Sequence, residues 1–88
     1  MMKFRLTSVY SLLEPSDRLE DSPGIEIHYK ADKKAIKFED CMRLAEKLSK
    51  QLDSELVAVK SSRGVCTLFM PAADFFHLKR RIPEEVEL

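Results

Sequence analysis

Few residues of this chain are of the types that perform catalysis, and none of them falls in a recognisable catalytic pattern. Histidine occurs only as His28 and His77. His28 falls on the polar side of an alternating segment and His77 lies in a basic stretch, with no serine or cysteine motif beside either. Nucleophilic catalysis needs a base within reach of the nucleophile. We therefore expect two solvated imidazoles, no catalytic residue and no enzyme.

The two cysteines, Cys41 and Cys66, are single and far apart in the sequence. Zinc sites use several Cys or His ligands at short spacings, and the chain has no C-x-x-C or H-x-x-x-H sequence. Both cysteines fall on apolar faces of predicted elements, so we expect buried free thiols that pack as small hydrophobic groups. Cys41→Ala would then cost only about 1–2 kcal/mol. We therefore expect no metal. We also expect no other cofactor, because a chain with two glycines cannot build a glycine-rich phosphate-binding loop.

Basic residues gather in three places, and these are the candidates for contact with phosphate. The candidates are Lys30, Lys33 and Lys34 in HYKADKKAIKF, Lys60 and Arg63 in the later hairpin, and Arg80 and Arg81 in HLKRR. If two of these clusters met on one face, their charges could hold a phosphate backbone. Basic hairpin tips also keep strand ends soluble. Tyr29 and Phe38 are in phase with the core and the chain has no Trp, so a solvated tip is the interpretation that we favour.

Length and composition predict one small globular domain over residues 1–88. The 88 residues are 44% hydrophobic and 34% charged, and their formal net charge is zero. A domain built mainly to hold nucleic acid usually has a clear basic excess. No stretch is long and apolar enough for a membrane span, and polar residues interrupt the start MMKFRLTSVYSLL, so we expect no signal peptide. Two cysteines are too few for a secreted disulfide scaffold, which makes the cytoplasm the expected location.

Hydrophobic periodicity predicts three strands and a loop in the first half of the chain. A half-buried strand over about 3–13 places Phe4, Leu6 and Tyr10 on one side. Segment 14–24 has two prolines and four acidic residues and predicts an exposed loop, whose function the sequence leaves open. Strands over about 25–30 and 35–38 are expected to form a hairpin that turns at Asp32–Lys33. This hairpin would pair Tyr29 with Ile36 and Ile27 with Phe38.

The second half of the chain predicts a helix, a hairpin and a shorter helix. A helix over about 39–53 carries an apolar stripe, formed with the preceding Phe38 by Cys41, Met42, Ala45, Leu48 and Leu52. Strands over about 56–61 and 65–70 are joined by a three-residue loop, Ser62-Arg63-Gly64. Pro71 then opens a helix over about 72–81. The fold class is α+β: a mainly antiparallel sheet of four to five strands with one amphipathic helix and a short C-terminal helix.

Both faces of the predicted hairpin over residues 56–70 are apolar, and this predicts an interaction surface. Helix 39–53 can cover only one face, and a C-terminal helix some 16 Å long is shorter than strands of about 20 Å. An uncovered apolar patch marks an interface, and a symmetric dimer is the commonest way to hide one. The partner-binding candidates are Val57, Val59, Phe69 and Phe76. Phe69→Glu should disrupt such an interface.

We therefore expect a small soluble, non-enzymatic protein-binding or regulatory module. It would act by docking on a protein partner or on a second copy of itself as a homodimer, without contact to a membrane. The alternative is a nucleic-acid-binding protein that uses the basic hairpin tips and the HLKRR segment. The sequence does not identify the partner.

Overall fold

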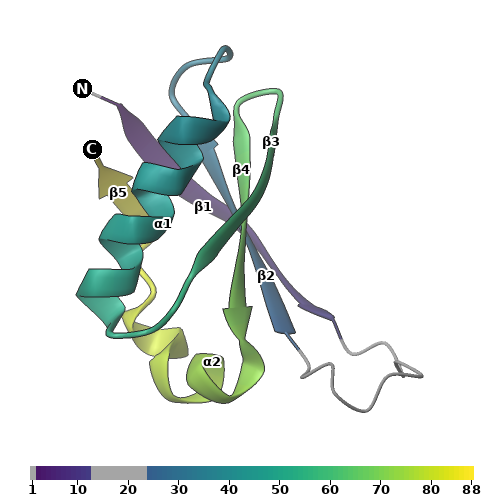
Figure 1. Ribbon diagram of the computed structural model, residues 1–88, viewed down its shortest axis with the longest axis vertical. Helices are drawn as coiled ribbons and strands as arrows, with labels where there is room; N and C mark the ends of the chain where they lie inside the picture. The colour runs from purple at the N-terminus through teal and green to yellow at the C-terminus, as the bar shows by residue number, and fades with distance from the viewer. Residues whose placement is uncertain (1, 13–23) are drawn as a thin grey trace.

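The alternating segments of the sequence form one antiparallel sheet in the computed structural model, which describes residues 2–12 and 24–88. The strands are β1 (Lys3–Leu12), β2 (Gly24–Ala31), β3 (Val57–Ser62), β4 (Val65–Pro71) and β5 (Glu85–Glu87). Their order in the sheet is β3-β4-β2-β1-β5 (Figure 1). Each pair of neighbours is antiparallel. The predicted α+β fold class is confirmed.

One long helix, α1 (Phe38–Leu52), packs across one face of this sheet, and the core lies between the two (Figure 1). The helix contributes the buried side chains of Cys41, Leu44, Ala45, Leu48 and Leu52. The sheet contributes alternate residues of its central strands, namely Ile25, Ile27, Tyr29 and Ala31 of β2 and Cys66, Leu68 and Met70 of β4. A short helix, α2 (Ala72–Leu78), and the 3₁₀ turn η1 (Lys79–Arg81) follow β4 and bury none of their own residues.

The predicted strand over 35–38, and with it the first hairpin, is wrong. Both edges of β2 are occupied, by β1 on one side and β4 on the other, so β2 offers no edge to a strand at 35–38. The chain instead reaches an extended residue, Lys37, whose backbone N–H donates to the Asp40 carboxylate at 3.0 Å. A side-chain acceptor of this kind stabilises a helix start. Phe38 is therefore the first residue of α1, and the fifth strand of the sheet is the unpredicted β5.

A tight turn joins β3 to β4 and brings it against the segment that follows β2. Ser62 pairs with Val65, so the loop has two residues, Arg63 and Gly64, and not the three that we predicted. Both have positive φ angles, 52° and 81°, as a type I′ hairpin turn requires. The Gly64 carbonyl accepts from the Ala31 N–H at 2.7 Å. A Cβ on Gly64 would lie 2.9 Å from the Lys33 carbonyl oxygen. The turn that contains Arg63 is therefore in close contact with the segment that contains Lys33 and Lys34.

An irregularity in β1 changes which side chains point to the core. The pairing of β1 with β2 shifts register between Leu6 and Ser8. An extra residue in one strand reverses the alternation beyond it. Phe4 is therefore buried as predicted, but Tyr10 lies opposite Glu26 and is 52% exposed. The prediction that Tyr10 shares the face of Phe4 is wrong.

The C-terminal segment is tied to the centre of the sheet by a buried phenol. Strand β5 pairs with β1, with Val86 opposite Phe4. The Tyr29 hydroxyl donates to the Pro83 carbonyl at 2.7 Å, just before this strand. Burial of the Tyr29 ring raises the pKa of the phenol above its ordinary value, since the charged form is poorly solvated there.

This burial predicts a loss of stability at alkaline pH. In the unfolded chain Tyr29 ionises near its ordinary pKa of 10.0, whereas the folded phenol stays protonated. The unfolded state then binds fewer protons, so the free energy of unfolding should fall above about pH 10, by up to about 1.4 kcal/mol per pH unit. Tyr29→Phe should lower the free energy of unfolding by about 1 kcal/mol at pH 7, because the hydrogen bond to Pro83 is lost. The same variant should lack the part of the alkaline decrease in stability that Tyr29 causes. Urea unfolding from pH 7 to 11 measures both; equal slopes in the two proteins would contradict the prediction.

Candidate binding surfaces

The apolar stripe of α1 is wider than the face that the sheet covers. Cys41, Leu44 and Leu48 are fully buried, but Phe38 and Met42 on the same stripe are 41% and 53% exposed. These two side chains line a groove between α1 and β3 with a volume of about 660 Å³. Its other apolar walls are Ala45, Leu56, Val57 and Ala58, and its charged residues are Glu39, Arg43 and Glu46. We call this feature the α1–β3 groove.

The lower end of the α1–β3 groove is fixed by a single side chain. The Ser49 hydroxyl donates to the Ala45 carbonyl at 2.7 Å within α1. The same oxygen accepts from the Leu56 N–H at 2.9 Å, immediately before β3. The residue that precedes β3 is therefore held against the last turns of the helix, and β3 then runs alongside α1 (Figure 1). The α1–β3 groove lies between these two elements.

Strand β3 is an edge strand, so in the described sheet one side of its backbone has no partner strand. Unpaired edges are templates for another strand, and proteins commonly guard them with lysines and bulges. Lys60 and the register irregularity between Ala58 and Lys60 guard the second half of β3. The first two residues of β3, Val57 and Ala58, carry no charge and line the α1–β3 groove together with the preceding Leu56.

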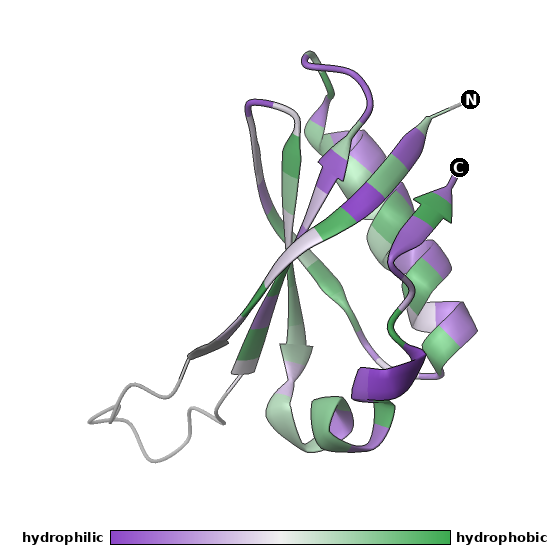
Figure 2. Ribbon diagram, turned by 180° about the vertical axis from the view of Figure 1, so that it is seen from behind, coloured by the Kyte–Doolittle hydropathy of each residue, from purple (hydrophilic) through white to green (hydrophobic). Residues whose placement is uncertain are grey.

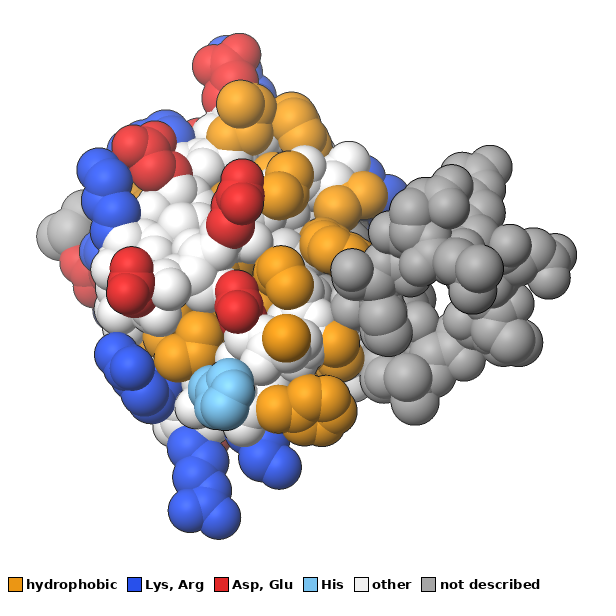
Figure 3. All heavy atoms as spheres, turned by 60° about the horizontal axis from the view of Figure 1, so that its bottom comes forward, with side chains coloured by type: hydrophobic (Ala, Val, Ile, Leu, Met, Phe, Trp, Pro, Cys, Tyr) orange, Lys and Arg blue, Asp and Glu red, His pale blue; other side chains and the backbone are white. Residues whose placement is uncertain are grey.

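The structure brings together only part of the predicted partner-binding set. Val57 lines the α1–β3 groove and is 51% exposed, and Val59 follows it on β3 at 54%. Phe69 lies opposite Val57, but its ring is half-buried over Gly24, where an added Cβ would be 1.8 Å from a ring carbon. Phe76 is 68% exposed on α2, outside the residues that line the groove. Figure 3 shows exposed hydrophobic side chains in a band across the end of the molecule that carries α2.

Sequence reasoning missed Phe38 and Met42 as surface residues and treated both as core. A signal for them was present in the sequence. Phe38, Cys41, Met42 and Ala45 are all apolar and follow one another at spacings of three, one and three residues. They therefore form an apolar face that is wider than the part of a helix that one sheet can cover.

A second concavity, of about 500 Å³, lies at the opposite end of the sheet from α2, and we call it the basic hollow. Six cations line it: Lys3, Arg5, Lys30, Lys33, Lys34 and Arg63. Asp32 and Glu85 are its two acidic residues. The structure thus unites four of the seven predicted phosphate-contacting residues and adds Lys3 and Arg5 to them. Lys60 is outside the hollow, and Arg80 and Arg81 lie in η1, next to α2.

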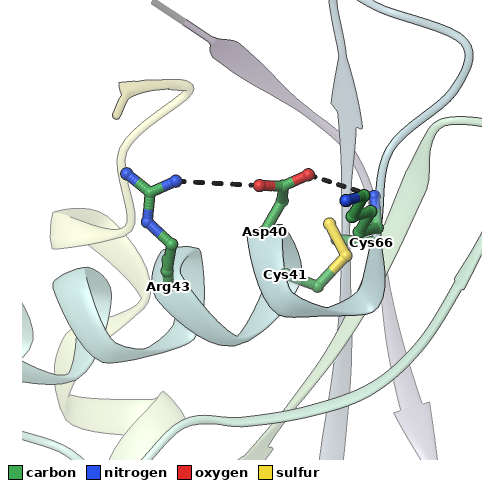
Figure 4. Close-up of a disulfide and its surroundings, with 5 residues drawn as sticks. Asp40, Cys41, Arg43 and Cys66 are labelled. Carbon is green, nitrogen blue, oxygen red and sulfur yellow. Dashed lines mark hydrogen bonds and ion pairs between the residues drawn. A yellow bond between two sulfur atoms is a disulfide. The ribbon is translucent and has the colours of Figure 1, made fainter.

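The prediction of free thiols is wrong, because Cys41 and Cys66 form a disulfide (Figure 4). Their Cα atoms are 5.5 Å apart and both residues are fully buried. Cys41 lies in the first turn of α1, on the side facing the sheet, and Cys66 lies on the inner face of β4. The sequence assigned each thiol to an apolar face correctly. It did not show that these two faces meet.

Comparison with known proteins assigns this chain to no family. No protein-family model, no curated protein and no solved structure matches it. Its class therefore rests on its own geometry, an α+β domain with an apolar groove at an open sheet edge and a basic hollow at one end. Within residues 2–12 and 24–88, no group of three or more His, Cys, Asp or Glu residues is placed to hold a metal ion. No helix in that same part of the chain is long and apolar enough to cross a bilayer.

Proposed function

We propose that this protein is a small, non-enzymatic protein-binding or regulatory module that docks on a partner protein through the α1–β3 groove. The observation that carries the proposal is the exposure of Phe38, Met42 and Val57 around one groove. Exposed apolar side chains that stand together mark interaction sites more often than isolated ones do. The groove also adjoins the unguarded half of β3, so it offers backbone hydrogen bonds beside an apolar surface.

This combination suits a partner that contributes an extended segment. Such a segment adds to a sheet edge through main-chain hydrogen bonds, while alternate side chains enter a flanking pocket. A second copy of the chain is the partner that we propose first, because it brings both an unpaired β3 and an apolar α1 face. Twofold symmetry would then close the interface.

Measurement of the oligomeric state tests this proposal. We expect the 10.2 kDa chain to scatter light as a dimer at tens of micromolar. Met42→Glu should shift it to the monomer, with at least a tenfold rise in the dissociation constant, because the new carboxylate would be buried unpaired. Gln51→Glu is the matched control, since it adds the same charge to an exposed position of α1 outside the groove.

A monomer would contradict the homodimer, and the wider docking proposal then needs a separate test. A photoreactive amino acid at position 42 should crosslink a protein in the cells that make this chain, whereas the same group at position 51 should not. Equal crosslinking from both positions, or none from either, would contradict docking at the groove.

We also propose that the module works in the cytoplasm, and the Cys41–Cys66 disulfide is the observation that weighs against this location. Disulfides are rare in reducing compartments. Subcellular fractionation tests the location, and recovery of the chain outside the cytoplasm would contradict it. Alkylation after acid quenching and denaturation shows whether the bond is present there, because both cysteines are buried in the folded protein.

A further inference from the structure

Figure 2 views the sheet from the side opposite α1, and the register of β1 and β2 assigns polar and aromatic residues to this side. Register places Arg5 opposite Lys30, Ser8 opposite His28, and Tyr10 opposite Glu26 on β1 and β2. The Tyr10 ring is 52% exposed and meets the His28 ring edge-on, with centroids 5.0 Å apart. The Glu26 carboxylate lies 2.6 Å from His28 Nε2 and holds this imidazole next to the Tyr10 ring. An aromatic ring held in this way is a platform on which a planar group can stack.

The same face leads into the basic hollow, because Arg5 and Lys30 belong to both. Among the described side chains, none of the six cations of the hollow forms an ion pair. One of its two carboxylates, Asp32, already accepts from the Lys3 backbone N–H at 3.3 Å. The whole chain has no net charge, so this local excess of positive charge comes from the fold. It is complementary to a polyanion.

The Tyr10 ring and the basic hollow are close enough to belong to one binding surface. Arg5 and Tyr10 are five residues apart on β1, which spans roughly 16 Å at the usual rise of a strand. A flexible polyanion of a few units can cover this length, with its charges at the hollow and a flat group at Tyr10. Single-stranded nucleic acid has this chemistry, since basic grooves hold its backbone and aromatic side chains stack on its bases.

We infer that the sheet face opposite α1 binds single-stranded nucleic acid, with phosphates at the basic hollow and a base stacked on Tyr10. The site uses neither the α1–β3 groove nor residues of HLKRR. The six cations that line the hollow limit the contact to a few phosphates. Binding is therefore salt-sensitive with a modest slope, on the order of 2–3 in log Kd against log salt for three or four phosphates.

Fluorescence anisotropy with labelled twelve-residue oligo-U and oligo-dT, between 50 and 200 mM salt, tests the inference. We expect micromolar binding at 50 mM salt. The double variant Lys33→Glu, Lys34→Glu should weaken it by tenfold or more, because both lysines line the hollow and are exposed. Arg80→Glu with Arg81→Glu makes the same charge change in η1 and should alter Kd by less than about threefold. Gln51→Glu, at an exposed position of α1 outside both the hollow and the groove, should also leave binding unchanged.

Tyr10→Ala provides the second arm and should also weaken binding by about tenfold, within the usual range for loss of one stacked base. Tyr10→Phe should retain it. Circular dichroism checks that each variant is folded. Equal losses in the two charge-reversal variants would overturn the inference, because the contact would then be general charge attraction. A second result would also overturn it: full competition by inorganic tripolyphosphate together with normal oligonucleotide binding by Tyr10→Ala. The hollow would then bind phosphate without any stacking on Tyr10. Absence of binding at 50 mM salt would also overturn it.

Discussion

Replacing Cys41 and Cys66 together by alanine should lower the free energy of unfolding by about 3–4 kcal/mol. The bond joins residues separated by 25 positions, and closing a loop of that length restricts the unfolded chain by about 3.5 kcal/mol at 25 °C. It also fixes the first turn of α1 to the inner face of β4. This loss is large for a domain of 88 residues, because such domains are typically stable by only about 5–15 kcal/mol.

Thiol counting in denaturant comes before the unfolding experiment. The unreduced protein should show no free thiol, and the reduced protein should show two. Cys41→Ala alone should cost about as much as the double replacement, since it breaks the same bond, and not the 1–2 kcal/mol expected for a packed thiol. Two free thiols in the unreduced protein, or a double variant within about 1 kcal/mol of the wild type, would contradict a stabilising disulfide.

Leu48→Ala should also destabilise strongly, by about 3–4 kcal/mol. Leu48 is fully buried on the face of α1 that meets the sheet. Truncation there removes apolar contacts and leaves a cavity that the sheet cannot fill by collapsing. Urea unfolding monitored by circular dichroism measures the loss as a shift of the midpoint at constant slope.

Met42→Ala is the matched control for Leu48→Ala. Both residues belong to the apolar stripe of α1, but Met42 is 53% exposed, so its truncation should change stability by less than about 0.5 kcal/mol. The same change should weaken docking at the α1–β3 groove. A loss above about 2 kcal/mol for Met42→Ala would show that this side chain belongs to the core, and the groove would lose its main apolar wall.

The sequence alone determined the local elements with good accuracy. The predicted helix 39–53 differs from α1 by one residue at each end, because its apolar stripe and its terminal charges all favour a helix over the same span. Alternation likewise identified the inner faces of β2 and β4, whose apolar side chains are buried. The Cys66 face was predicted in this way, as was the outer position of His28.

Only the tertiary structure decided how these faces meet. Periodicity records which side of an element is apolar and carries no information about which other element covers it. The order of the strands decides which strands pair with β2 and whether Cys41 and Cys66 can form a bond. It also brings Gly64 into contact with Lys33 and Lys34. The register irregularity near Thr7 placed Tyr10 on the outer face, since one extra residue reverses a twofold alternation. The packing of α1 on the sheet divided a single apolar stripe into buried core residues and the exposed wall of the α1–β3 groove.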